Sequence, residues 1–170
     1  IALAQVNLKN AQRDLDQTKK TQDVFVENAR RKMFSDGLVA NSNTGSVIAN
    51  TPTISGTYIG LEGEYLFSVS GSDYVNFSGI EVGTTKISTT ISQPFGTKGL
   101  SIVFPSDSYA GQSGSWKIKI PNTNTSVYLT NLNAYNQAKE TRDSSISVAE
   151  SLVSQREAEL NLKRATARQP

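Results

Sequence analysis

The sequence predicts an α+β protein, an antiparallel coiled-coil helical hairpin with a small antiparallel β-sandwich inserted at its tip. Residues 1–36 and 132–170 carry apolar residues in a heptad rhythm with few helix breakers, which predicts two long helices. Residues 52–131 change to a period of two, and glycine- and proline-containing turns divide them into short predicted strands. Because each helix has only a narrow apolar stripe, the two helices bury their stripes most simply against each other. Residues 37–51, rich in Asn, Ser, Thr and Gly, are the predicted linker.

The stripe of the first predicted helix holds small and polar residues as often as large ones. Gly37 follows Ser35 and Asp36 and is the expected left-handed cap of this helix. The basic residues 30–32 lie in the last turns, where they complement the helix dipole, and a basic contact patch is the alternative interpretation. With alternating spacings of four and three, the stripe consists of Ala4, Leu8, Ala11, Leu15, Thr18, Gln22, Phe25, Ala29 and Lys32.

The second predicted helix has two adjacent apolar tracks. Its apolar face is therefore wider than a strict seam, and we expect it to contact more than one neighbour, in this chain or in another copy. The first track is Ala134, Ala138, Thr141, Ser145, Val148, Leu152, Gln155, Glu159 and Leu162, and the second is Ile146, Ala149, Val153, Leu160 and Ala167.

Three alternating apolar runs define the main strands of the predicted sandwich. They are Tyr65, Phe67 and Val69; Leu100, Ile102 and Phe104; and Trp116, Ile118 and Ile120. Shorter candidate strands are residues 46–49, 74–78, 86–91 and 126–129. About six to eight short antiparallel strands in this length are typical of a jelly-roll or immunoglobulin-like sandwich.

Composition excludes several classes of site. The chain has no cysteine and no histidine, which removes thiolate and imidazole ligands, disulfides and the usual general base. Seven basic and five acidic residues in 1–36, four and five in 37–131, and six and five in 132–170 give net charges of +2, −1 and +1. No segment is basic enough to predict nucleic-acid binding. The sequence shows neither a membrane span nor a signal peptide, and we interpret it as a fragment of a longer, membrane-anchored protein.

A few residues are candidates for a functional site, but each also has a simpler structural explanation. Trp116 is a candidate sugar-stacking ring, but it shares a face with core positions and we expect it to be buried. Asp73 and Asp107 are better explained as turn caps than as calcium ligands. Glu62 and Glu64 are a candidate acid–base pair, although a solvated edge strand explains them better. We therefore predict no catalytic, cofactor-binding or metal-binding residues, no cofactor and no enzyme activity.

The two helical stretches resemble the coiled-coil hairpin of hemolysin-secretion-type membrane-fusion proteins, also called periplasmic adaptor proteins. The stretches that carry the resemblance are ALAQVNLKNAQRDL at residues 2–15, AESLVSQREAELNLKRA at 149–165 and the closing ATARQP at 165–170. The resemblance implies a parent protein with a membrane anchor, a lipoyl-like domain and a β-barrel domain, which bridges an inner-membrane transporter to an outer component. The hairpin tip of that family usually carries an Arg-Leu-Ser-type contact for a channel. Here a β domain takes its place, so docking through that motif is not carried over.

The resulting functional prediction is a non-catalytic structural subunit of a bacterial cell-envelope export or efflux assembly. Its expected location is extracytoplasmic, in the periplasm or at the cell surface, and its expected partners are envelope transporter or channel proteins and copies of itself. The β domain is then a docking or spacer module. The alternatives are a flagellin-like filament protein, in which terminal helices bracket inserted β domains, and a stalked carbohydrate- or cell-wall-binding module with an exposed Trp116 or tyrosine cluster.

Overall fold

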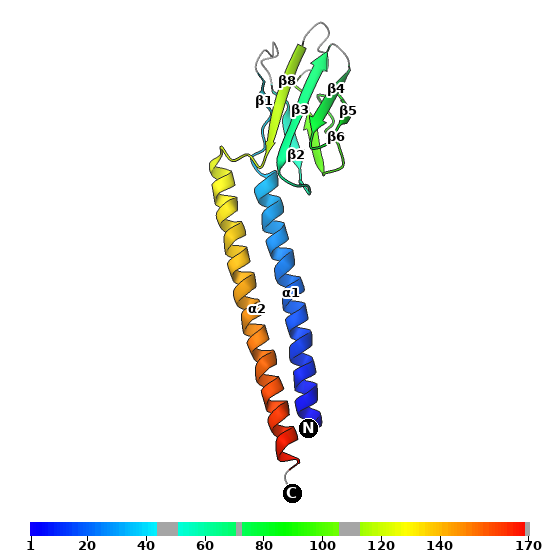
Figure 1. The fold of residues 1–170 in the computed structure, drawn as a ribbon. Coiled ribbons are helices and arrows are strands. Elements are labelled where there is room, and N and C mark those ends of the chain that lie inside the picture. The colour runs from blue at the N-terminus through cyan, green and yellow to red at the C-terminus, as the bar shows by residue number, and fades with distance from the viewer. Residues whose placement is uncertain (44–50, 71–72, 106–112, 169–170) are drawn as a thin grey trace. The chain divides into compact units, whose positions relative to one another are not determined.

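The computed structural model describes residues 1–43, 51–70, 73–105 and 113–168. The chain forms two compact units (Figure 1). The helical unit combines residues 1–29 with 133–170, and the strand unit is the continuous stretch 30–132.

The helical unit contains most of two long helices, α1 (Ala2–Ser35) and α2 (Ser126–Thr166). Within this unit the two helices lie side by side and run in opposite directions (Figure 1). Exposed ion pairs join them: the Lys19 and Glu150 side chains are 3.2 Å apart, and those of Arg142 and Asp23 are 3.8 Å apart. Such exposed pairs contribute little to stability, about 0–1 kcal/mol each, so packing must supply the rest.

Packing between the helices is thin. Among the described residues of the helical unit, Ala11 and Leu160 alone are buried, each about 5% exposed. The predicted stripe of α1 is half-buried or buried as far as Gln22, but Phe25 is 55% exposed, and Val26 is half-buried in its place. The side of α2 that is partly buried follows the second predicted track, through Ile146, Ala149, Val153 and Leu160, while most of the first track is exposed.

The described residues of the strand unit form eight antiparallel strands in two sheets. The five-stranded sheet has the order β1-β8-β3-β4-β5, and the three-stranded sheet has the order β2-β7-β6. The strands are β1 (Asn41–Ser42), β2 (Thr53–Gly56), β3 (Gly63–Ser70), β4 (Tyr74–Gly79), β5 (Gly83–Lys86), β6 (Gln93–Phe95), β7 (Leu100–Val103) and β8 (Ser113–Ile120).

Aromatic side chains from both sheets form the core of the strand unit. Tyr65, Phe67 and Phe77 come from β3 and β4, and the ring of Phe95 on β6 stands edge-on to all three. The centroid of the Phe95 ring lies 5.1, 4.9 and 6.0 Å from those of Tyr65, Phe67 and Phe77. Edge-to-face pairs of this kind add about 0.5–1.5 kcal/mol each beyond the burial of their area. The alternation predicted for the three main strands is confirmed by the burial of their inward residues.

Helix ends are part of the same core. Phe34, in the last turn of α1, packs against it, and Leu38 and Ala40 just beyond are buried in it. The Ser35 hydroxyl accepts a hydrogen bond of 2.8 Å from the backbone N–H of Tyr58. On the α2 side, the amide of Asn131, which is 5% exposed, donates to the carboxylate of Asp36 at 3.1 Å and to the Lys32 carbonyl at 3.4 Å.

These observations correct the predicted fold. The α+β class is confirmed, but an antiparallel coiled-coil hairpin with a small β-sandwich inserted at its tip is wrong. In the part of the chain that the structure describes, two helices flank in sequence an antiparallel region of eight strands. Among the described residues of the helical unit only Ala11 and Leu160 are buried, so they do not form the continuous buried apolar seam that defines a coiled coil. The strand region is also not a separate insertion, because it takes in the last turns of α1 and the first turns of α2.

Three shorter predictions have separate outcomes. The candidate strand 126–129 is wrong, because the Thr125 hydroxyl accepts the Tyr128 N–H at 3.1 Å and caps the start of α2 at Ser126. Most of candidate 86–91 is also wrong, since β5 ends at Lys86 and the Ser88 hydroxyl accepts the Ile91 N–H at 3.1 Å in a turn. Candidate 46–49 lies outside the described residues.

Substitution of Asn122 tests the hydrogen bonds that hold the helix ends in the strand unit. Its side chain is 6% exposed, and its amide donates a 2.7 Å hydrogen bond to the carbonyl of Gly37. We expect Asn122→Ala to lower the free energy of unfolding by about 1–3 kcal/mol, because the Gly37 carbonyl loses the donor that the buried Asn122 side chain supplies. Urea unfolding followed by tryptophan fluorescence measures the change. The exposed Asn124→Ala is the matched control, and equal losses in both variants would contradict the assignment.

Candidate functional site

The glutamates predicted as the candidate acid–base pair lie at the start of β3. Glu64 lies on β3, which is flanked by β8 and β4 and is therefore not an edge strand. Its carboxylate is 2.8 Å from the ammonium of Lys117 on β8. Glu62 precedes the strand and is exposed. The solvated edge strand expected here is therefore wrong, because β3 is an inner strand with a cross-strand ion pair on its outward face.

Trp116 is buried, as expected. It is 0% exposed, and its ring lies edge-on to Phe104 with centroids 6.1 Å apart. A buried ring cannot stack on a sugar, which counts against Trp116 as a carbohydrate platform. Asp73 is exposed, and its backbone carbonyl accepts the Ile87 N–H at 2.8 Å, while Asp107 lies outside the described residues.

The basic residues 30–32 at the end of α1 differ in their surroundings. Arg30 donates to the carbonyl of Gly60 at 3.1 Å, and its guanidinium lies 5.1 Å from the centre of the Phe34 ring. This cation–π geometry ties Arg30 to the strand unit. Lys32 is exposed. Arg30 is therefore engaged within the strand unit, whereas Lys32 is open to solvent.

A hydrogen-bonded carboxylate that sequence reasoning missed connects two loops of the strand unit. Glu81 follows β4 and accepts hydrogen bonds from the Tyr65 hydroxyl at 2.5 Å, from the Thr97 N–H at 2.9 Å and from the Thr97 hydroxyl at 2.7 Å. Partial burial raises the pKa of Glu81, but the hydrogen bonds from Tyr65 and Thr97 and the charge of Lys98 outweigh it and hold that pKa below its ordinary value. Burial, followed by the hydrogen bond to Glu81 and its charge, raises the pKa of Tyr65.

The Glu81 cluster is suited to holding structure together. Gly96, with φ of 62°, leaves the space that the Glu81 carboxylate fills, so this side chain bridges the β4–β5 and β6–β7 turns. The phenol of Tyr65 is kept neutral and donates its proton toward the carboxylate, which leaves neither group poised to exchange protons near neutral pH. No local sequence signal predicts this cluster, because its three members come from separate turns and strands.

Clustered metal ligands and membrane-spanning helices are both lacking among the described residues. That part of the chain contains no group of three or more Asp, Glu, His or Cys residues placed to hold a metal ion. None of the helices in the described ranges is long and apolar enough to cross a membrane.

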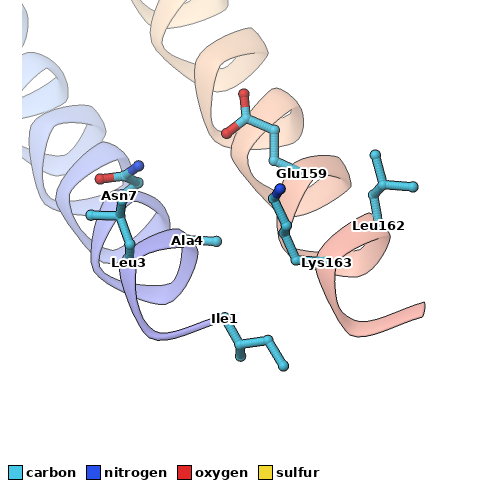
Figure 2. Close-up of a pocket in the computed structure, with 7 residues that line it drawn as sticks. All are labelled: Ile1, Leu3, Ala4, Asn7, Glu159, Leu162 and Lys163. Carbon is cyan, nitrogen blue, oxygen red and sulfur yellow. The ribbon is translucent and has the colours of Figure 1, made fainter. Parts of the chain in front are cut away.

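Apolar side chains gather instead on the surface of the helical unit. A groove of about 410 Å³ lies between the start of α1 and the last turns of α2 (Figure 2). In Figure 2, Ala4 points from α1 toward α2, and Glu159 and Lys163 lie on the side of α2 that faces α1. The residues that line the groove are Ile1, Leu3, Ala4, Asn7, Glu159, Leu162 and Lys163.

Exposed residues along α2, which include Leu162 at the groove, form a row that we call the outer stripe. Val148, Leu152 and Leu162 in this stripe are 69%, 38% and 63% exposed. Four of its members repeat every seven residues and Leu152 lies one turn beyond Val148, so they share one side of the helix. The stripe consists of Thr141, Val148, Leu152, Gln155 and Leu162. Most of the first predicted track of α2 is therefore exposed, whereas Glu159 faces α1.

No protein family, curated protein or solved structure matches this chain.

Proposed function

We propose that this chain is a non-catalytic structural subunit of a bacterial cell-envelope export or efflux assembly, of the adaptor or membrane-fusion type. The observation that carries the proposal is the outer stripe of α2. Three large apolar side chains, Val148, Leu152 and Leu162, are exposed along one side of a long helix, and another helix commonly covers a surface of this kind. The sequence resemblance of residues 2–15 and 149–165 to adaptor helices supports the same assignment.

Energetics favour association through this surface. Full burial of one Val or Leu side chain contributes about 1.5–3 kcal/mol, so covering three of them outweighs several exposed ion pairs. The helical unit by itself buries few side chains, which leaves its stability dependent on further packing. Copies of the same chain and helices of a transporter or channel are the partners that this proposal names. The strand unit then serves as a docking module or spacer.

A charge placed in the outer stripe tests this proposal. We expect the chain to self-associate in sedimentation velocity as its concentration rises to about 100 µM, a range in which weak interfaces become populated. The triple variant Val148→Glu, Leu152→Glu and Leu162→Glu is expected to remain monomeric, because association would bury three charges. Its helix content, measured by far-ultraviolet circular dichroism, should match that of the parent chain.

Leu61→Glu is the matched control for this experiment. Leu61 is 82% exposed on a loop of the strand unit, so the substitution adds a similar charge away from the outer stripe. We expect this variant to associate as the parent chain does. A parent chain that stays monomeric, or a triple variant that associates equally well, would contradict the proposal.

A further inference from the structure

A second hollow lies within the strand unit, apart from the outer stripe. It has a volume of about 480 Å³ and is formed where β3 begins, where β8 ends and where α2 starts. Backbone at Gly63 and the buried residues Ile120 and Pro121 contribute to its lining. The polar side chains around it are Glu62, Glu64, Lys119, Thr123 and Tyr128.

The walls of this hollow are fixed before any ligand arrives. Asn122 is buried and is held by its hydrogen bond to Gly37, while its carbonyl accepts the Thr125 hydroxyl at 3.2 Å. The same Thr125 oxygen accepts the Tyr128 N–H, which positions the first turn of α2. A site whose parts are already ordered loses less entropy on binding, so even a small polar ligand can be held.

Charges around the hollow cancel. Glu64 is paired with Lys117 at 2.8 Å, and the Lys119 ammonium is 3.3 Å from the Thr123 hydroxyl. The lining itself holds Glu62, Glu64 and Lys119. Lys117 lies outside the lining and neutralises Glu64, which leaves one carboxylate and one ammonium and no strong net attraction for an ion. The hollow offers both hydrogen-bond acceptors and hydrogen-bond donors, which is the requirement of a neutral ligand rich in hydroxyl groups.

Tyr128 supplies an aromatic wall beside these polar groups. Its side chain is half-buried and lines the hollow. An aromatic face next to carboxylates and an ammonium suits a ligand with an apolar C–H face and a rim of hydroxyls. We propose that this hollow binds a neutral saccharide, with Tyr128 against the sugar face, Glu62 and Glu64 accepting from its hydroxyls and Lys119 donating to them. The sugar is either a free oligosaccharide or a unit of an insoluble polysaccharide.

Titration followed by ¹⁵N-edited nuclear magnetic resonance tests this inference on the full chain. The probes are cellotriose, maltotriose and chitotriose, each up to about 20 mM, because a shallow site of this size is expected to bind with a Kd of about 1 mM. We expect at least one trisaccharide to shift the amide signals of residues 62–64, 119–123 and 128. Pull-down of the chain by insoluble cellulose, chitin and peptidoglycan distinguishes the polymer source from the free one.

Two variants and one control make the result decisive. Glu62→Gln, at an exposed position, is expected to raise Kd about tenfold without affecting folding, and Tyr128→Leu should abolish the shifts. Asp73→Asn, an exposed acidic turn residue away from the hollow, should leave Kd unchanged. The inference is overturned if no trisaccharide shifts these signals, or if sodium phosphate or glycylglycine shifts them equally. Because the outer stripe is not involved, this result and the self-association result are independent.

Discussion

Replacing Phe95 with alanine is expected to lower the free energy of unfolding of the strand unit by about 3–5 kcal/mol, the range found for deletion of a buried phenylalanine ring. Phe95 is 1% exposed, and it is the residue of the three-stranded sheet that meets the rings of Tyr65, Phe67 and Phe77 from the other sheet. Its loss leaves a cavity between the sheets and removes three edge-to-face contacts. Many domains of this size have a total stability of only about 5–15 kcal/mol, so Phe95→Ala should be close to unfolded.

Urea unfolding followed by the fluorescence of Trp116 measures this effect, since the single tryptophan lies in the same core. Phe25→Ala is the matched control, because this phenylalanine is 55% exposed on α1. We expect the control to change stability by less than about 0.5 kcal/mol. Equal effects of the two substitutions would mean that Phe95 does not connect the sheets.

Glu81→Ala is expected to have the second largest effect, a loss of about 1–3 kcal/mol at neutral pH. The substitution removes the acceptor of the Tyr65 hydroxyl and of both donors of Thr97. Because Tyr65 is 0% exposed, its hydroxyl would then be buried without this acceptor. Thermal unfolding by circular dichroism measures the loss. Glu62→Ala, at an exposed position beside the same sheet, should unfold at the temperature of the parent chain.

Acidification should remove the contribution of Glu81. The folded pKa of this carboxyl lies below its ordinary value of 4.5, because hydrogen bonds from Tyr65 and Thr97 favour the charged form over the opposing effect of burial. A lowered folded pKa means that the stabilisation is present above the unfolded pKa and is lost as pH falls through the folded pKa. The stability difference between the parent chain and Glu81→Ala should be constant from neutral pH down to the unfolded pKa and should shrink below it. A difference that grows on acidification would refute the assignment.

Periodicity predicted the strands well and the helix contacts poorly, for a physical reason. In a strand, inward and outward residues alternate strictly, so Tyr65, Phe67 and Val69 have only one side to bury. On α2 the two tracks lie on adjacent sides of one helix, and their apolar content is similar. Local spacing cannot decide which side faces α1. The structure buries Leu160, half-buries Val153 and leaves Val148 exposed.

The helix ends and the Glu81 cluster could not be predicted from local sequence, because they depend on contacts between residues far apart in the chain. The strand-like composition of 126–129 was overridden by the Thr125 cap, and the end of α1 was joined to the strand unit through Phe34 and Ser35. The candidate surface was partly visible in the sequence, since the outer stripe is most of a predicted track. The role of Glu81 could not be predicted from the sequence, because its partners Tyr65 and Thr97 are each 16 residues away.

The pairing of Asn122 with Gly37, and of Asn131 with Lys32 and Asp36, has a mechanical consequence. These hydrogen bonds clamp the point where the chain enters the strand unit to the point where it leaves. A force that pulls on the chain at these two points therefore acts on the hydrogen bonds before it acts on β1 or β8. We expect the two sheets to stay folded under a pulling force for as long as these hydrogen bonds remain intact.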